Sequence, residues 1–521
     1  MIPLFSQQQV READNFAINK LKIPSSILME NAAISILYAI LEKYPYFDYS
    51  YKFGIVCGKG NNGGDGFTLA RQLLIRGFTV KVISLATESE LKGDALLNYK
   101  ITRNLIDDYE NSGIKIYKSA RDLNYITDCE IIIDAILGTG AFGDLREPYK
   151  SIVQKVNKIP ALKIAIDSPT GLNLNNASGE EIFKANLTVT LAEMKTGLFY
   201  EKGKIFSGEV KKGSIGIGNS YFDNIDTKDF LIEPEDALRF LPKRNENINK
   251  YSAGKILVIG SSGNMPGAGI FAINSAMISG SGAGKIFVPK SLKQLIQSKM
   301  NSAIVSDYED NNNGFLSVVN YNEAKKIVDW ADAIAIGPGL GREKETAEFV
   351  YKLLEDYKGK RVVIDADAIN ALKNGGYQKF HLHNKVFTPH HKEFADLLGI
   401  ELSELKQNLL NYGRKFTSET NSYLVLKGST TIIFNPIGEI FINSSGNAGL
   451  AKFGSGDALT GLITSFIVQQ ESIEESIISA VYLHGLTADL IKKNESEFGI
   501  IPDKLINKLP TAIKFLRKSI V

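Results

Sequence analysis

The chain has few of the residues that most often bind metals or form crosslinks. Its 521 residues include two cysteines, Cys57 and Cys129, five histidines and one tryptophan. Both cysteines lie in or beside apolar, strand-like runs, where a buried reduced thiol is more common than a disulfide. All five histidines fall in the last third, so the first half has no histidine base or histidine-bound metal. We therefore predict a cytoplasmic protein whose first half works with carboxylates, lysine and backbone groups.

The chain also lacks an excess of charge and a long apolar run. Lys and Arg number 60 against 58 Asp and Glu, a formal net charge of +2, which gives no general reason to expect nucleic acid or an anionic membrane as partner. No run of about 18 apolar residues is present, and the first residues do not resemble a secretory signal. Small molecules are therefore the expected ligands.

The length predicts at least two domains, because a single hydrophobic core stops growing near about 250 to 300 residues. Strand-like runs at 53–58, 79–85, 130–137 and 163–169 alternate with helix-period stretches at 67–77 and 147–159, after a helical segment at 26–43. This alternation predicts an α/β fold, with a Rossmann-like, doubly wound sheet covered on both faces.

The alternation fades after a glycine-rich stretch at 213–220 into polar, charged sequence around 242–254. Strand-like runs then resume at 255–262, 332–341, 361–372 and 422–434. We predict domains at 1–225 and 226–521, the second also α/β. A polar loop is expected at 307–314.

The first candidate site begins at KGNNGGDG (59–66), directly after a strand-like run. Glycines there let backbone N–H groups approach an anion, although a tight turn explains such glycines about as often. Asn61, Asn62 and Asp65 add oxygen ligands. Asp134 and Asp167 follow two further strands, and the carboxyl ends of parallel strands line the ligand crevice of such a sheet. Each aspartate alone is as well explained as a helix cap or loop residue, but three together favour a site.

The motifs KGNNGGDG, IDAILGTGAFG and IDSPTGL, after an opening like SSILMENAA, resemble those of NAD(P)H-hydrate epimerases over about residues 1–220. The resemblance implies a potassium ion held by Asn62, Asp134 and Thr170. It also implies Asp167 and Lys195 as catalytic residues for epimerising the hydroxyl-bearing carbon. The implied dinucleotide contacts are Asn61, Asn62, Gly63, Gly64 and Asp65 in one segment, and Gly138, Thr139, Gly140, Ala141, Phe142, Gly143 and Asp144 in another.

The second candidate site centres on FGSGDALTG (453–461), where a Gly-Ser-Gly turn opens an apolar helix. Such a turn presents backbone N–H groups and the helix dipole to a phosphoryl group, and Asp457 can activate a substrate hydroxyl. A capped helix with an early carboxylate explains this motif alone equally well. The segments GPGLG (337–341), DADAIN (365–370) and KGSTT (427–431) at other strand ends favour a nucleotide site, although KGSTT alone is also typical of a hairpin turn. For HLHNKVFTPHH (381–391), we prefer His390 as a substrate contact over a zinc site.

These motifs are similar to those of the ribokinase-like superfamily and, more narrowly, of ADP-dependent NAD(P)H-hydrate dehydratases over about 230–521. The resemblance implies Asp457 as the catalytic residue. It places Ala253, Gly339 and His390 on the hydrated dinucleotide, and Lys427, Gly428, Ser429, Thr430, Thr431, Gly454, Ser455 and Gly456 on the adenine nucleotide or in the anion hole. The chain departs from the usual family pattern at His391, Lys392, Lys452 and Phe453.

Together the two halves predict a bifunctional enzyme that repairs hydrated NADH and NADPH. The first domain interconverts the R and S epimers, and the second dehydrates the S form with ADP and Mg²⁺, which yields AMP and phosphate. A homo-oligomer is expected from family habit alone. The alternative is a small-molecule kinase of a vitamin-precursor alcohol, fused to a non-catalytic nucleotide-binding module.

Overall fold

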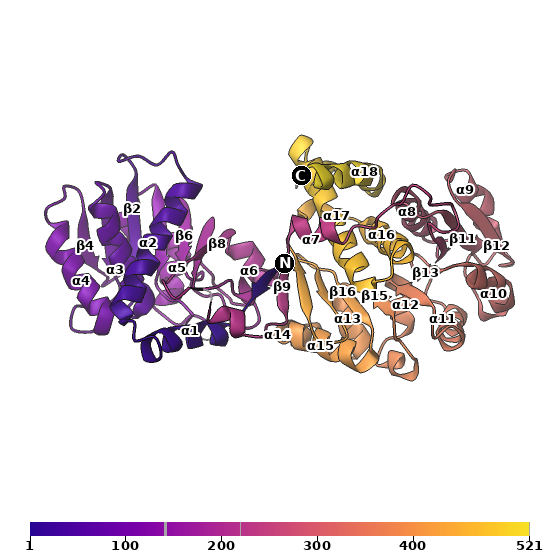
Figure 1. Ribbon diagram of the computed structural model, residues 1–521, viewed down its shortest axis with the longest axis horizontal. Helices are drawn as coiled ribbons and strands as arrows, with labels where there is room; N and C mark the ends of the chain where they lie inside the picture. Colours follow the sequence, from indigo (N-terminus) through magenta and orange to yellow (C-terminus); the bar gives the residue numbers. More distant parts are fainter. Residues whose placement is uncertain (140–142, 219, 520–521) are drawn as a thin grey trace. The chain divides into compact units, whose positions relative to one another are not determined.

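The computed structural model describes residues 1–139, 143–218 and 220–519 (Figure 1). The chain forms two compact units, Pro3–Thr227 and a second that runs from Lys228 onward. Met1 and Ile2 group with the second unit, where the N-terminal amine donates a hydrogen bond to Asp236 Oδ1 at 2.7 Å. The first two residues thus differ from the division expected from the sequence.

The first unit is built on a seven-stranded parallel sheet in the order β4-β3-β2-β5-β6-β7-β8. Its strands are β2 (Lys52–Cys57), β3 (Thr79–Ser84), β4 (Gly113–Ile116), β5 (Ile131–Ala135), β6 (Leu162–Ile166), β7 (Leu187–Leu191) and β8 (Glu209–Gly213). Its helices are α1 (Gln7–Asn19), α2 (Ser25–Lys43), α3 (Asn61–Leu74), α4 (Gly93–Ile106), α5 (Tyr149–Asn157) and α6 (Glu201–Phe206). Alternate residues of the central strands pack against α2, α3 and α4 on one face and against α5 on the other. This confirms the predicted doubly wound sheet.

Helix α2 is long and apolar enough to cross a membrane when judged by length and composition alone. In the structure, eight of its nineteen residues are buried. Ala33, Ile36, Leu37 and Ile40 lie in the same hydrophobic cluster as strands β2, β3 and β5. The apolar composition of α2 is therefore explained by its contact with the sheet.

The second unit contains a mixed eleven-stranded sheet in the order β1-β9-β18-β17-β16-β15-β14-β13-β10-β11-β12. Its strands are β1 (Ile2–Leu4), β9 (Asp229–Ile232), β10 (Lys255–Ile259), β11 (Ala283–Pro289), β12 (Ile304–Tyr308), β13 (Ala333–Ile336), β14 (Arg361–Ile364), β15 (Lys385–Phe387), β16 (Tyr423–Leu426), β17 (Ile432–Phe434) and β18 (Ile440–Asn443). Strands β10 to β16 pair in parallel, while β17 is antiparallel to both of its neighbours. Residues 307 and 308, expected in a loop, end β12.

The helices of the second unit are α7 (Pro234–Arg239), α8 (Pro266–Ile278), α9 (Lys293–Gln297), α10 (Tyr321–Trp330), α11 (Lys344–Asp356), α12 (Ala366–Ala371), α13 (His391–Leu398), α14 (Leu402–Gln407), α15 (Leu409–Thr420), α16 (Ser455–Gln469), α17 (Ile473–Asn494) and α18 (Pro502–Ser519). Apolar residues of α16, α17 and α18 form one cluster with central strands, and α8 packs beside them with β10 and β11. Helix α16, which begins at the Gly-Ser-Gly turn, therefore lies directly on the sheet.

Both cysteines are free thiols buried in the first unit. Burial raises the pKa of Cys57 well above its usual range, and it raises the pKa of Cys129 to about 12. The two residues act as small apolar side chains of the core, as predicted.

Glycines in the first turns of α3 allow that helix to approach the sheet closely. A Cβ atom added at Gly63 would overlap the carbonyl oxygen of Gly58, and one added at Gly66 would lie 2.8 Å from Cys57 Sγ. Neither glycine has a positive φ, so close packing and not backbone conformation requires them.

Gly63→Ala should therefore destabilise the contact between β2 and α3 by about 1–3 kcal/mol, the usual cost of overpacking. Hydrogen–deuterium exchange of peptides from β2 and α3 measures this as faster opening. Gly60→Ala is the matched control, because no atom lies within 4 Å of its added carbon. Equal exchange in the two variants would contradict the packing explanation.

Candidate active sites

The glycine-rich segment of the first domain forms the beginning of α3. The sequence had suggested a loop here, with the helix starting at 67. Asn61, Asn62, Gly63, Gly64 and Asp65 all lie within the helix, whose N-cap is Gly60. Asn62 is buried, and neither its Oδ1 nor its Nδ2 atom has a hydrogen-bond partner among the described residues. Because an unpaired buried amide costs free energy, Asn62 is prepared for a ligand. Asp65 is also buried, and burial together with the charge of Asp167 raises its pKa well above the usual range.

Asp134, the fourth residue of β5, is fully buried and held by Thr170. Its Oδ1 accepts hydrogen bonds from Thr170 Oγ1 at 2.7 Å and Ile136 N at 3.1 Å, and its Oδ2 accepts from Thr170 N at 2.7 Å. Burial still raises the pKa of Asp134 to about 6, although these hydrogen bonds oppose the shift. A cation bound here would remove this cost of burying negative charge.

Asp167 directly follows β6 and pairs with Lys195. Lys195 Nζ donates to Asp167 Oδ1 at 2.8 Å and also to Thr190 Oγ1 at 2.7 Å and the Leu191 carbonyl at 2.9 Å. Burial alone would raise the pKa of Asp167, but the charge and hydrogen bond of Lys195 hold it below its usual value. Asp167 has a φ of 66°, a conformation that is uncommon for residues other than glycine.

The segment after β5 brings these residues together. Leu137 N donates to Thr170 Oγ1 at 3.1 Å, and Thr139 N donates to Asp167 Oδ2 at 3.1 Å. A Cβ atom added at Gly138 would lie 3.1 Å from both Asn62 Oδ1 and Asp167 Oδ2. The carboxyl ends of β2, β5 and β6 thus share one cradle, as the sequence predicts. Gly143 and Asp144 are exposed beyond it, and Gly140, Ala141 and Phe142 lie outside the described residues.

The second candidate site lies where α16 begins. Gly454 is its N-cap, with a φ of 91° that favours glycine, and Ser455, Gly456 and Asp457 form its first turn. The Ser455 N–H donates to the Lys452 carbonyl at 3.3 Å, while the next N–H groups of such a first turn have no helical acceptor and can bind a ligand. Burial raises the pKa of Asp457 to about 7, with the charge of Asp365 adding to the shift and that of Lys427 opposing it.

Lys427 lies beside this turn. Its Nζ donates to Asp365 Oδ1 at 2.9 Å, and a Cβ atom added at Gly456 would lie 3.3 Å from that same nitrogen. Thr460 Oγ1 donates to Asp365 Oδ2 at 2.7 Å, so one carboxylate joins α16 to the lysine. Asp365 is the N-cap of α12 and follows β14 directly. The sequence indicated its segment, DADAIN, by the position at a strand end, but it gave Asp365 no role of its own.

The KGSTT segment connects the antiparallel strands β16 and β17, so it is a hairpin connection. It also lies next to the candidate site. Gly428 and Ser429 are exposed, while Thr430 is buried, and Asn443 N donates to the Thr431 carbonyl at 3.0 Å. The backbone N–H of Lys427 donates to the Pro389 carbonyl at 2.8 Å, which brings KGSTT to His390.

His390 is the N-cap of α13, where its Nδ1 accepts from Glu393 N at 3.2 Å. Its exposed side chain remains available to a ligand. In the described ranges, no group of three or more His, Cys, Asp or Glu side chains is arranged to hold a metal ion.

The structure does not bring Ala253 to this edge of the sheet. Ala253 is buried just before β10, at the amino end of that strand, and the neighbouring Gly254 packs on Val468 near the last residue of α16. Val468 lies eleven residues after Asp457 on α16, about 16 Å along the helix, so Ala253 lies near the opposite end of α16 from Asp457. The placement of Ala253 on the dinucleotide is therefore wrong for a ligand bound at Asp457.

Gly339, by contrast, follows β13 at its carboxyl end and touches the start of α8. A Cβ atom added at Gly339 would lie 2.9 Å from Ala268 Cβ. Ala268 follows β10 among small residues. The strand-end pattern that indicated GPGLG as part of the site could also have indicated Ala268. The site thus extends over the ends of β10, β13, β14, β15 and β16.

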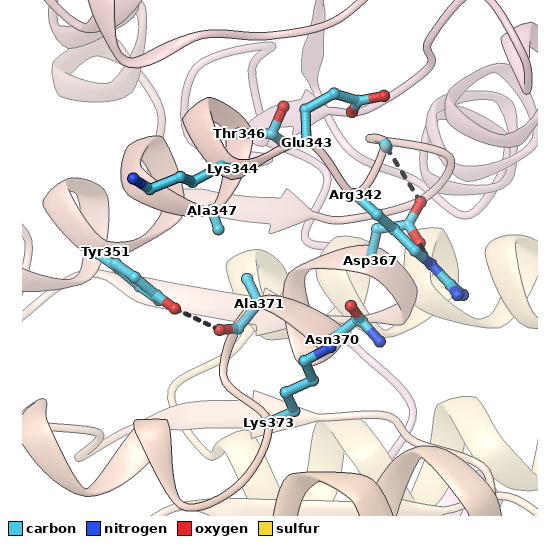
Figure 2. A pocket seen from close by; sticks show the side chains of 11 residues that line it. Arg342, Glu343, Lys344, Thr346, Ala347, Tyr351, Asp367, Asn370, Ala371 and Lys373 are labelled. Atoms are coloured by element: carbon cyan, nitrogen blue, oxygen red, sulfur yellow. Dashed lines mark hydrogen bonds and ion pairs between the residues drawn. The ribbon is translucent and has the colours of Figure 1, made fainter.

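Figure 2 shows a pocket that is lined in part by Asp367 and Arg342. Arg342 Nε donates to Asp367 Oδ1 at 2.9 Å, and Gly341 N donates to Asp367 Oδ2 at 3.1 Å. The charge of Asp367 also contributes to the raised pKa of Asp457, after burial and the charge of Asp365.

The residues that depart from the usual family pattern lie around the same turn. His391 Nε2 would lie 2.9 Å from a Cβ atom added at Gly428, and Lys392 forms a surface ion pair with Asp396 at 2.8 Å. Lys452 donates to the Phe498 carbonyl, and Phe453 is fully exposed. None of these contacts displaces Asp457 or its turn.

Known proteins match both parts of the chain. A family model described as YjeF-related protein N-terminus matches residues 25–197, and one described as NAD(P)H-hydrate dehydratase matches 256–511. The bifunctional NAD(P)H-hydrate repair enzyme Nnr of Methanocaldococcus jannaschii is 34% identical, over 95% of this chain and 91% of its own length. The corresponding enzyme of Moorella thermoacetica is 30% identical, over 99% of this chain and 98% of its own. A crystal structure of a ribokinase-like superfamily protein of Enterococcus faecalis, 27% identical, matches with a TM-score of 0.50 over 56% of this chain and 98% of its own.

These matches confirm the two resemblances and the α/β fold class predicted from the sequence. Relatives at least 30% identical span almost the entire chain and place both candidate sites in one family. The chain therefore belongs to the bifunctional NAD(P)H-hydrate repair enzymes, which join an NAD(P)H-hydrate epimerase to an NAD(P)H-hydrate dehydratase.

Proposed function

We propose that Asp167 and Lys195 epimerise the hydrated dinucleotide in the first domain, with the substrate held along 61–65 and 138–144. The observation that carries this proposal is the buried pair at 2.8 Å, in which Lys195 keeps Asp167 ionised next to an open cradle. An ionised Asp167 accepts the proton of a water or hydroxyl at the reacting carbon. Between proton transfers, the positive charge of Lys195 balances the negative charge of Asp167, and the hydrogen bond from Lys195 orients the carboxylate.

Asn62, Asp134 and Thr170 would hold a potassium ion beside this pair. The unpaired amide of Asn62 and the buried carboxylate of Asp134 fit such an ion, because K⁺ prefers oxygen ligands and would satisfy both groups. When bound, the ion supplies positive charge that favours the anionic phosphates of a dinucleotide.

In the second domain we propose that Asp457 activates the ring hydroxyl of the S epimer toward the β-phosphoryl group of ADP. A hydroxyl is a poor leaving group, and its phosphate ester is a good one, so loss of phosphate returns NADH or NADPH and leaves AMP. The N–H groups after Gly454 and the Lys427 ammonium face the transferred group. Lys427–Thr431 and Gly456 hold the nucleotide, and His390 and Gly339 contact the dinucleotide.

Mg²⁺ usually binds through substrate phosphates and waters with one or two carboxylates, and the carboxylates near this turn suit that mode. When bound, it supplies charge that neutralises the phosphates. We also propose that the protein is cytoplasmic and forms a homo-oligomer.

The decisive assay supplies both epimers with Mg²⁺, K⁺ and either ADP or ATP, and follows the return of reduced-nicotinamide absorbance. We expect complete conversion with ADP. Conversion that stops when the S epimer is used up, with the R epimer lost no faster than in an enzyme-free mixture, would show that the first domain does not epimerise. No recovery with either nucleotide, but a phosphorylated alcohol formed from ATP, would favour the kinase alternative.

Asp167→Asn should lower the epimerase kcat by about 100-fold or more, because general base catalysis contributes about 10²–10⁴. Dehydration of pure S epimer by the same preparation should not change. The matched control is Asp128→Asn, a half-exposed surface carboxylate of the same domain. Epimerisation at the wild-type rate in Asp167→Asn would overturn the assignment.

The dehydratase kcat/KM should fall about tenfold per pH unit below about pH 7, because Asp457 must be ionised to act as a base and its pKa is about 7. Lys427→Met removes a charge that lowers this pKa, so the break in the profile should move to higher pH. Asp457→Asn should lose the activity. An unchanged break in Lys427→Met would contradict the role given to the lysine.

A further inference from the structure

One buried histidine contacts the anion-hole turn without facing the substrate. His484 lies on α17, and its side chain is buried in the second domain. Its Nε2 atom lies 3.0 Å from the carbonyl oxygen of Ser455. A carbonyl oxygen only accepts hydrogen bonds, so Nε2 must carry the hydrogen.

We propose that His484 is a positioning residue for phosphoryl transfer, fixing the peptide group between Ser455 and Gly456 so that the Gly456 N–H faces the nucleotide. This inference rests on the proposed dehydratase function. Because the peptide bond is planar, the Ser455 carbonyl and the Gly456 N–H belong to one rigid unit and point in opposite directions. A donor that holds the carbonyl therefore fixes the direction of the N–H.

The Gly456 N–H is the group that needs such support. It belongs to the first turn of α16 and has no helical acceptor, and a Cβ atom added at the same residue would lie 3.3 Å from Lys427 Nζ, at the proposed phosphate position. Gly456 has no side chain of its own to pack and hold the turn. A donor that is aimed before the reaction begins contributes more to the transition state than one that must turn toward it.

The segment that leads into the turn also contacts α17. Gly446 N donates to Asp489 Oδ2 at 2.7 Å, and Asn447 Nδ2 donates to Asp489 Oδ1 at 2.8 Å. A Cβ atom added at Gly485 would overlap Ser445 Oγ, so α17 approaches the start of the segment closely. Helix α17 thus holds the segment 445–456 at its start through Asp489 and at its end through His484.

His484 is also suited to remain a neutral donor. Burial lowers its pKa to about 4, and the charge of Lys427 adds to this shift although the Ser455 carbonyl opposes it. An uncharged imidazole does not compete with Lys427 for the phosphates. The hydrogen bond is therefore present throughout the pH range in which Asp457 titrates.

The test compares two amides at this position. In His484→Gln the side-chain amide reaches as far as Nε2 of histidine and can donate to the Ser455 carbonyl, whereas in His484→Asn it is too short. We expect the dehydratase kcat of His484→Asn to fall by about 10- to 100-fold, somewhat less than the loss of a complete oxyanion donor. KM for the hydrate should change little, and His484→Gln should retain most of the wild-type kcat.

The epimerase activity of the same chain and the thermal unfolding of the second domain serve as controls for folding. Wild-type turnover of the S epimer with ADP tests the proposed function in the same assay, before any variant is compared. Wild-type kcat in His484→Asn would overturn the inference. Equal loss of kcat in both folded variants would overturn it as well, because a merely structural imidazole predicts no rescue by glutamine.

Discussion

In each domain, the candidate site is built around a lysine that pairs with one buried aspartate at a strand end. Lys195 binds Asp167 at 2.8 Å in the first domain, and Lys427 binds Asp365 at 2.9 Å in the second. Burying a carboxylate is costly unless it is paired. The charge and hydrogen bond of Lys195 hold the pKa of Asp167 below its usual value against the effect of burial. Asp134 and Asp457, which have no hydrogen bond from a lysine among the described residues, have raised pKa values instead. The first domain therefore holds carboxylates of different basicity within one cradle.

The two pairs act differently because of where they lie relative to the reacting group. Asp167 is itself the paired carboxylate, and its pairing makes it a base that is ionised at neutral pH. Asp457 is next to a pair, so it feels the negative charge of Asp365 and the positive charge of Lys427 together. The first arrangement suits reversible proton exchange at one carbon. The second suits a base that must take a proton and remain protonated while a phosphoryl group moves.

Much of the fold was predictable because buried parallel strands appear in the sequence as short, continuous apolar runs. The apolar runs that became β2, β5, β6, β10 and β14 are continuous, since both faces of these strands are covered. Strands β4 and β8 were missed at the sheet edges, where residues such as Glu209 are exposed. Strands β7 and β11 were missed as well, although both lie inside their sheets. The start of α3 was missed because its glycines suggest a loop. They are glycines because Gly58 and Cys57 lie too close for a side chain, which only the tertiary structure shows.

The candidate sites followed the same rule. Asp65, Asp134 and Asp167 were found because the ends of parallel strands meet at one edge. Ala253 was misplaced because it precedes its strand, and the end of a strand at which a residue lies decides the edge that it reaches. The unpaired amide of Asn62 and the bond from His484 to Ser455 were beyond sequence reasoning, because both depend on contacts between residues far apart in the chain.

The two buried cysteines have a consequence for the conditions under which the enzyme works. Oxidants such as peroxide attack the thiolate, and the raised pKa values of Cys57 and Cys129 leave almost no thiolate at neutral pH. Neither thiol is exposed for glutathione or a second chain to reach. An enzyme that restores reduced nicotinamide nucleotides thus presents no reactive thiol to the oxidants that consume those nucleotides.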